Sequence, residues 1–300
     1  MVAISLVVIT YARADMLRAC LKSCIRQTTD LDGGVEIVVV DNNPAGTARP
    51  IVDEIASRAP VPVRYVHEPT PGIPNARNAG IAATEGPILG FVDDDQTLAE
   101  DWLALMTRRF GSDPVDCLFS NVEPVFSEPG LQPPPAIAGA YRRRLGDRGS
   151  GGALLRRATC FVDTTPFDPR TMHTGGEDTE FFARLDQLGR TFGWCMEAIA
   201  YEHVPSGRLK LSVVMQRQFA GGQHFAESRV RHSAYPIATA AKILAKAVMQ
   251  SGGLAVAALV SPLLGRDRRC YVLIRLSGAL GKLLWPLRLE LRRRSTVTAP

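Results

Sequence analysis

Three consecutive aspartates, Asp93, Asp94 and Asp95, directly follow the short apolar run Ile88–Val92. Adjacent carboxylates repel one another, so such a run is either a solvated turn or a site for a cation. A divalent cation that also carries phosphates would neutralise the three charges, because Mg²⁺ and Mn²⁺ bind through oxygen ligands. The rest of the sequence is needed to distinguish between these two interpretations.

A second acidic centre, Glu177 and Asp178, follows a pair of glycines in GGEDTEFFARL. Apolar residues at helical spacing predict an amphipathic helix over Glu177–Leu188, and acidic residues in a first helical turn are favoured by the helix dipole alone. Chemistry gives a second explanation. A carboxylate set apart from a metal site could deprotonate an attacking hydroxyl while the metal neutralises a leaving group. His203, in YEHVPSGR, could add an imidazole to the metal, although a single histidine is more often structural.

The first hundred residues contain the elements that must position these groups. Four apolar runs of strand length alternate with three helical patterns; the runs are Ile4–Thr10, Val35–Val40, Val63–Val66 and Ile88–Val92, and the helices are Asp15–Gln27, Thr47–Ala59 and Asn75–Thr84. This alternation predicts an α/β fold with a mostly parallel, Rossmann-like sheet flanked by helices. Parallel sheets bind ligands beyond the carboxyl ends of their strands, where TYARAD, DNNPAG, HEPTPGIPNARNAG and DDDQ all fall. We therefore expect a polar-ligand site along that edge.

The middle of the chain has a weaker pattern. Strands are predicted at Cys117–Val125 and at Thr159–Asp163. Between them, YRRRLGDRGSGG is basic and then rich in glycine, which is typical of a mobile loop near an acceptor or of a solvated surface loop.

Charge is distributed unevenly along the 300 residues. Residues 233–300 contain 11 Lys and Arg against 2 Asp and Glu, whereas the preceding part contains 24 against 28. A basic nucleic-acid-binding domain is therefore not indicated. The apolar segments Ala247–Gly265 and Cys270–Arg294 are interrupted by Gln, Gly, Pro and cations, so they favour helices that lie in a membrane interface, with Lys and Arg toward anionic headgroups. We predict a domain of residues 1–232 and a membrane-associating helical tail of residues 233–300, with a helical layer on the protein's own surface as the alternative.

The cysteines and the N-terminus predict a compartment. Six cysteines are scattered without a CxxC pair, which is typical of reduced core thiols. MVAISLVVITYARAD lacks a basic start and a cleavage site, so it reads as a buried strand and not as a signal peptide. A cytoplasmic location is expected.

The order of the segments VVITYAR, IVVVDNN, GIPNARNAG, FVDDD, GGEDTEFFARL and EHVPSGRL resembles that of family 2 glycosyltransferases, which have the GT-A fold. RQFAGGQHFA and the basic tail are similar to the succinoglycan-type glucosyltransferases of bacterial exopolysaccharide assembly. The resemblance implies an inverting, Mg²⁺- or Mn²⁺-dependent transfer of a sugar from a UDP-sugar, with glucose expected. It also implies a lipid-linked oligosaccharide acceptor at the cytoplasmic face of the inner membrane. QRQFAGGQ has no Trp after its Arg, unlike processive members, so one sugar per acceptor is expected.

The resemblance also implies residue roles. Eight residues are expected to bind the nucleotide sugar: Thr10, Tyr11, Arg13, Asp41, Arg77, Asn78, Asp93 and Asp94. Three are expected to bind the metal, namely Asp95 as principal ligand, Asp93 and His203. Asp178 would be the catalytic base, and Glu177 would support it.

Three alternatives remain at this point. DDDQT also fits the D-x-D-x-T pattern of haloacid-dehalogenase-like phosphatases, but it follows the fourth predicted strand, and no lysine lies between Lys22 and Lys210. Transfer to polyprenyl phosphate would need no strong base. A non-catalytic scaffold of a glycan-assembly complex could retain the nucleotide pocket.

Overall fold

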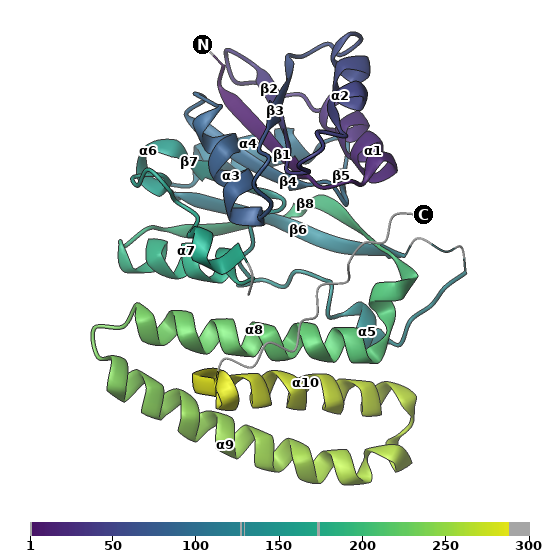
Figure 1. Cartoon of the computed structure of the whole chain (residues 1–300), viewed down its shortest axis with the longest axis vertical. Coiled ribbons are helices and arrows are strands. Elements are labelled where there is room, and N and C mark those ends of the chain that lie inside the picture. The colour runs from purple at the N-terminus through teal and green to yellow at the C-terminus, as the bar shows by residue number, and fades with distance from the viewer. Residues whose placement is uncertain (1, 127, 129, 173–174, 288–300) are drawn as a thin grey trace. The chain divides into compact units, whose positions relative to one another are not determined.

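The computed structural model describes residues 2–126, 128, 130–172 and 175–287 (Figure 1). Its internal contacts divide the chain into two compact units. The first consists of Met1–Val125, Tyr141–His173 and Glu180–Val204; the second consists of Phe126–Ala140, Thr174–Thr179 and Pro205–Pro300. The predicted boundary after residue 232 remains a prediction, although the helix α8 (Leu211–Arg231), which precedes that boundary, packs with the helices that follow it.

An eight-stranded sheet forms the centre of the first unit, in the order β3-β2-β1-β4-β7-β6-β8-β5. The strands are β1 (Ile4–Thr10), β2 (Val35–Asp41), β3 (Val63–His67), β4 (Ile88–Asp93), β5 (Gln96–Leu98), β6 (Cys117–Phe126), β7 (Ala153–Arg156) and β8 (Phe192–Val204). The first four along the chain pair in parallel, whereas β7 pairs antiparallel with β4 and β6, and β5 pairs antiparallel with β8. The α/β fold with its parallel N-terminal sheet is thus confirmed.

The register of the parallel strands brings the predicted site residues to one edge. Thr10 lies opposite Asp41, and Ile9 lies opposite Asp93. Carboxyl ends of parallel strands meet at the same edge of a sheet, so the polar residues that end β1, β2 and β4 become neighbours although about 80 residues of chain separate the first from the last.

Helices cover both faces of this sheet. They are α1 (Ala14–Cys24), α2 (Arg49–Ala56), α3 (Ile73–Ala82), α4 (Trp102–Ser112), α6 (Arg157–Cys160) and α7 (Glu177–Gln187). Alternate residues of β1 join two different cores, because successive side chains of a strand point to opposite faces. Leu6 packs in one core with Leu17 and Trp102, and Val7 packs in the other with Phe91 and Phe181. All six cysteines are buried and free, as the sequence predicts.

One predicted strand is wrong. Thr159–Asp163 was expected to be extended, but Arg157–Cys160 forms the helix α6, and the strand lies earlier, at Ala153–Arg156. The Arg157 guanidinium donates hydrogen bonds to the carbonyl of Gly86 and to the Thr84 hydroxyl. These contacts direct the chain away from the sheet immediately after β7. They outweigh the preference of the following residues for a β-strand.

The second unit is helical. It contains α5 (Pro135–Ala138), α8 (Leu211–Arg231), α9 (Pro236–Val260) and α10 (Arg266–Leu284). The described residues of both units also form short 3-10 turns at Pro169–Met172, Ser206–Leu209, Ser261–Leu264 and Trp285–Leu287. α8, α9 and α10 run side by side (Figure 1), and α10 packs against both neighbours. A Cβ at Gly222 of α8 would clash with the carbonyl oxygen of Gly278 of α10, and a Cβ at Gly281 would clash with that of Phe219. Small residues allow this close backbone approach.

Two segments of this unit are long and apolar enough to cross a membrane by length and composition. Pro236–Leu263 has a mean hydropathy of 1.7 with 11% of its most apolar window buried, and Arg266–Leu287 has a mean hydropathy of 1.2 with 33% buried. α9 leaves large apolar side chains in solvent, among them Met249 at 78% and Leu259 at 82% exposure. The last part of the predicted tail, residues 288–300, lies outside the described residues.

The close approach of α8 and α10 gives a prediction at two adjacent glycines. Gly222→Ala should lower the free energy of unfolding by about 1–3 kcal/mol, because the added methyl group meets the backbone of α10. Gly221→Ala should raise it by up to about 1 kcal/mol, because no atom lies within 4 Å and alanine favours a helix. Urea unfolding of both variants measures the difference. Equal effects would show that the two helices do not pack in this way.

Candidate functional site

The middle carboxylate of the acidic run points into the protein. Asp94 is 5% exposed, and its two oxygens accept hydrogen bonds from the Thr10 hydroxyl and from Nη1 of Arg13, each at 2.8 Å. Burial raises the pKa of Asp94 above its ordinary value, and the Arg13 charge opposes part of that rise. Asp94 therefore joins the end of β1 and the start of α1 to the acidic run. Its predicted contact with the nucleotide sugar remains a prediction.

Asp95 lies between this ion pair and β8. Its Oδ2 is 3.1 Å from Nη1 of Arg13, and its backbone carbonyl accepts the N–H of His203 at 2.7 Å. The structure thus brings together the predicted metal ligands Asp95 and His203. Nε2 of His203 lies 2.9 Å from the Thr97 hydroxyl, so the imidazole would bind a metal through that nitrogen only if it left Thr97.

Asp93 is the most exposed member of the run, with 36% of its side chain accessible. Nη2 of the buried Arg77 lies 3.6 Å from Oδ1 of Asp93. The Arg77 guanidinium stacks 5.2 Å from the ring centre of Phe167 and 5.9 Å from that of Phe91. The accessible carboxylate of Asp93 therefore lies beside the buried positive charge of Arg77.

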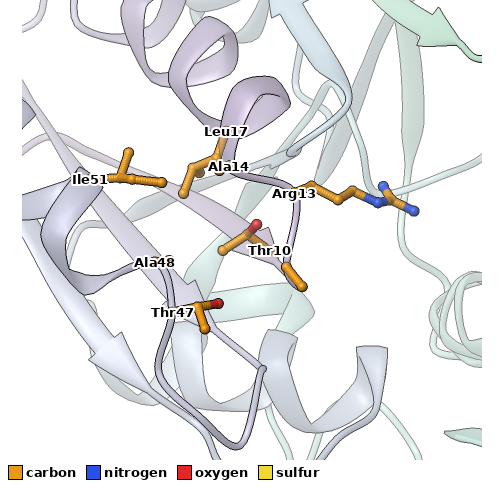
Figure 2. Close-up of a pocket in the computed structure, with 8 residues that line it drawn as sticks. Thr10, Arg13, Ala14, Leu17, Thr47, Ala48 and Ile51 are labelled. Carbon is orange, nitrogen blue, oxygen red and sulfur yellow. The ribbon is translucent and has the colours of Figure 1, made fainter. Parts of the chain in front are cut away.

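A cavity of ≈ 240 Å³ is lined in part by Thr10 and Arg13, the two residues that hold Asp94 (Figure 2). Its lining residues are Thr10, Ala12, Arg13, Ala14, Leu17, Thr47, Ala48 and Ile51. Leu17 and Ile51 form an apolar wall, while the guanidinium of Arg13 points away from them (Figure 2). An apolar pocket with a few polar groups at its border suits a flat heterocyclic base. Tyr11 lies in the same loop with 45% exposure but is not one of the lining residues.

Two predicted nucleotide-binding residues have local partners. The carboxylate of Asp41 is buried and accepts hydrogen bonds from the backbone N–H groups of Asn43 and Ala48 and from the Tyr65 hydroxyl. Burial and the nearby Asp41 charge raise the pKa of Tyr65 to about 12. The amide of Asn78 donates to the carbonyl of Phe167 and accepts its N–H. Both side chains therefore hold loops, and their roles toward the nucleotide remain predictions.

The predicted catalytic pair belongs to the second unit. Glu177 and Asp178 begin α7, after Gly176 with φ 85°; Glu177 is buried, and Asp178 is partly exposed. A Cβ at Gly176 would lie 2.5 Å from Cγ of His224 in α8. The Ser228 hydroxyl, one turn further along α8, donates to the carbonyl of Thr179 at 3.2 Å. α8 thus supports the residues on both sides of the pair.

The basic and glycine-rich segment is solvated in its basic part, as predicted, but its glycine-rich end is buried. Ser150, Gly151 and Gly152 are buried. The Arg143 guanidinium donates hydrogen bonds to the carbonyls of Gly149 and Gly151, at 3.1 and 2.6 Å. One arginine of the basic run therefore fixes the glycines that follow it.

This fixed loop lies against Asp93. A Cβ at Gly151 would be 2.9 Å from Cγ of Asp93 and 3.0 Å from Nε2 of Gln96. Gly152 donates its N–H to the carbonyl of Phe91 in β4 at 2.7 Å. Arg143 and Gly151 are thus positioning residues for the accessible carboxylate. Sequence reasoning missed them, and the only available signal was an arginine shortly before a glycine pair.

The acidic residues fit a cation that shares its ligands with a substrate. Among the described residues, no group of three or more His, Cys, Asp and Glu side chains could hold a metal ion by itself. Asp93 and Asp95 supply hard oxygen donors, and Mg²⁺ is commonly held by one or two carboxylates together with substrate phosphates. The donor set therefore fits Mg²⁺ or Mn²⁺ bound with a diphosphate better than it fits a structural metal.

Comparison with known proteins agrees with this geometry. A sequence profile described as glycosyl transferase family 2 matches residues 5–167. The chain is 30% identical over 225 residues to the succinoglycan biosynthesis protein ExoM of Rhizobium meliloti (strain 1021), covering 72% of each chain. Mannosyltransferase PcManGT from Pyrobaculum calidifontis, solved with GDP-Man and Mn²⁺, matches with a TM-score of 0.64 at 19% identity over 95% of this chain and 87% of that one. S. aureus TarS 1-349 in complex with UDP matches with a TM-score of 0.53 at 17% identity over 97% and 93%.

The fold and the acidic edge of the sheet define a glycosyltransferase with the GT-A fold. The chain belongs to glycosyl transferase family 2.

The loop that lines the cavity contains a strained residue. Ala12 has φ 53°, the only positive φ among the described residues other than glycine. Ala12→Gly should raise the free energy of unfolding by up to about 1 kcal/mol, because glycine adopts this conformation without a Cβ clash. Ala19→Gly, at an exposed position within α1, should lower it by about 0.5–1 kcal/mol. Thermal or urea unfolding compares the two, and destabilisation by both would contradict the strained backbone at Ala12.

The contact between Gly151 and Asp93 gives a prediction for metal use. Gly151→Ala should raise the Mn²⁺ concentration needed for half-maximal donor turnover by about tenfold or more, because a small displacement of a reacting constellation has a large effect on rate. Gly111→Ala, in α4 with no atom within 4 Å, is the matched control and should leave this concentration unchanged. Wild-type metal dependence in a folded Gly151→Ala variant would rule out the positioning role.

Proposed function

We propose that the protein transfers a sugar, with glucose expected, from a UDP-sugar to a hydroxyl group of a lipid-linked oligosaccharide in exopolysaccharide synthesis. The observation that carries this proposal is the cavity lined by Arg13, whose guanidinium also pairs with the carboxylates of Asp94 and Asp95. A base-sized pocket beside two carboxylates suits a nucleoside diphosphate with its cation. The name of the relative ExoM, a succinoglycan biosynthesis protein, supports the polysaccharide context.

The donor end of the proposed site is formed by residues of the first unit. Thr10, Thr47 and the apolar wall would hold the nucleoside, and Arg77 would keep Asp93 in place from behind. Asp93 and Asp95 would bind Mg²⁺ or Mn²⁺, with His203 as a further ligand. When bound, the metal ion supplies Lewis-acid neutralisation of the diphosphate leaving group. The Mn²⁺ and nucleotide sugar in the related mannosyltransferase structure are consistent with these roles.

The acceptor end would depend on Asp178. Its carboxylate would take the proton of the acceptor hydroxyl while the hydroxyl oxygen forms a bond to the anomeric carbon. The bond from that carbon to the UDP oxygen breaks in the same step, and UDP leaves with the electron pair. Attack and departure on opposite faces invert the anomeric centre. Glu177, buried beside Asp178, would help to orient it.

The helical unit supports a peripheral position on the membrane. α8 packs along α10 in the same layer of helices. It carries polar residues such as Gln218 and Glu227. If α9 and α10 crossed the bilayer, α8 would be drawn into the hydrocarbon, where such groups are strongly disfavoured. A layer lying in the interface keeps the polar groups of α8 hydrated and buries the apolar side chains of α9. These features favour a peripheral position on the membrane, and the cytoplasmic face is expected from the resemblance to family 2 glycosyltransferases and from the reduced cysteines.

Substitution at Asp178 separates this proposal from its alternatives. Asp178→Asn should reduce transfer to an oligosaccharide hydroxyl by about a hundredfold or more, because proton removal is lost. Asp186→Asn, eight residues further along α7 on an exposed ion pair with Arg148, is the control and should retain activity within about twofold.

The measurement is UDP-glucose turnover with and without Mn²⁺, after a thermal-shift screen has identified the nucleotide sugar that stabilises the protein. Near wild-type transfer by a folded Asp178→Asn variant would favour a phosphate acceptor, which needs no base. Absence of metal-dependent turnover of any nucleotide sugar by the wild-type protein would favour a non-catalytic scaffold.

A further inference from the structure

One helix of the second unit, α8, supports the predicted catalytic pair on both sides. The pair belongs to the same compact unit as α8, α9 and α10. Immediately before the pair, Gly176 packs against His224 of α8. Immediately after it, the carbonyl of Thr179 accepts a hydrogen bond from the Ser228 hydroxyl at 3.2 Å. Within this unit, α8 is therefore the element that sets the position of the pair.

The opposite face of α8 lies on α10. Met215, Phe219 and Gly222 are spaced by four and three residues along α8, so they share one face of the helix. A helix turns by about 100° per residue, so His224 and Ser228 lie roughly opposite that face. α8 is thus held between α10 on one side and the segment that contains the catalytic pair on the other.

The contact between α8 and α10 is made largely by backbone atoms and leaves no spare volume. A Cβ at Gly281 of α10 would clash with the carbonyl oxygen of Phe219. The Ser277 hydroxyl of α10 donates a hydrogen bond to the carbonyl of Met215 at 2.6 Å. Because protein interiors are close-packed, an added group at this contact must displace α8.

The other face of α8 cannot absorb such a displacement. A Cβ at Gly176 would lie 2.5 Å from Cγ of His224 and 2.7 Å from its Nδ1, so the imidazole already rests on the glycine backbone. Ala226 and Ser228 are buried on α8 as well. A shift of α8 away from α10 would therefore move Gly176 and the catalytic pair that follows it.

We propose that α10 positions the catalytic pair through α8, with Gly281 and Ser277 as the positioning residues, so that the tail serves the transfer reaction in addition to the proposed membrane attachment. The inference rests on the proposed function, since it takes Asp178 as the base. Both positioning residues act through α8 and not on the substrate. A misplacement of about 1 Å far from the chemistry can lower a rate by about a hundredfold, so a contact of this kind is sufficient.

Two glycines of α10 give a matched comparison in the full-length protein. Gly281→Ala places a methyl group against the carbonyl of Phe219, whereas a Cβ at Gly278 has its nearest neighbour, the carbonyl oxygen of Gln218, at 3.6 Å. Ser277→Ala is a further variant that adds no bulk and removes the hydrogen bond to α8. A cooperative thermal transition first establishes that each variant is folded.

The activity measurement is Mn²⁺-dependent release of UDP from UDP-glucose, with water as the acceptor and no membrane present, so membrane attachment cannot contribute. We expect Gly281→Ala to lower kcat by about tenfold or more while the dissociation constant of UDP stays within about twofold of the wild type. Ser277→Ala should lower kcat by about two- to fivefold, and Gly278→Ala should match the wild type. In an Asp178→Asn background, Gly281→Ala should change kcat by no more than about twofold, because changes that act through one group are not additive.

The ring signals of His224 report the position of α8 without any turnover. They are recorded by nuclear magnetic resonance on histidine-labelled protein, and His224→Gln assigns them. Gly281→Ala should shift these signals, and Gly278→Ala should leave them unchanged. His203, in the first unit, is the internal control and should keep its signals in both variants.

A wild-type kcat in folded Gly281→Ala would overturn the positioning role, as would a loss that appears in donor affinity instead of kcat. An undiminished effect of Gly281→Ala in the Asp178→Asn background would also overturn it, and unshifted His224 signals would overturn transmission through α8. If Gly281→Ala does not fold, the same outcomes apply to Ser277→Ala. Near wild-type turnover by Asp178→Asn alone would instead overturn the proposed base, and the His224 signals would still decide whether α10 sets the position of α8.

Discussion

The buried pairing of Asp94 with Thr10 and Arg13 is the constraint on which the first unit depends. Three adjacent carboxylates at one strand end would repel one another, but this pairing turns the middle one into the protein and leaves Asp93 and Asp95 on either side of it. Burying a carboxylate is unfavourable, as its raised pKa shows, and the hydrogen bonds from a hydroxyl and a guanidinium offset that penalty. The same two residues line the cavity, so the acidic run and the proposed nucleoside pocket share one support.

Close packing then fixes the accessible carboxylate. Arg77 is buried between aromatic rings behind Asp93, and Gly151 touches the carboxylate so closely that no side chain fits there. Arg143 holds the loop of Gly151 through hydrogen bonds to backbone carbonyls. Gly151 and Arg143 contact no substrate in the proposed reaction, and the contact of Arg77 with the nucleotide remains a prediction. They restrict the rotamers of Asp93, and pre-organisation of this kind is what a site for a cation and a diphosphate requires.

The parallel strands and their polar ends could be predicted, because short apolar runs and the topology of α/β sheets determine them. Both signals are contained in short stretches of sequence. The roles of Asp41 and Asn78 could not be judged in this way, since each side chain is engaged by backbone groups that only the folded loops bring near. The same limit explains the misplaced strand at Thr159–Asp163, where Arg157 reaches carbonyls about 70 residues earlier. Arg143 cannot be distinguished from the other cations of its loop by sequence, because the carbonyls that it binds are present in every residue.

α8 makes contacts on two of its sides within the second unit. His224 packs against Gly176, immediately before the predicted catalytic pair, and the next residue, Phe225, holds its ring beside Lys282 of α10. Consecutive side chains of a helix point about 100° apart, so the two contacts lie on different sides of one rigid element. Gly222, one turn earlier, allows the backbone of α8 to pack directly against that of α10. A larger residue at this position would separate the two helices. The packing of α8 on α10 and its support of Gly176 therefore depend on the same position of one helix.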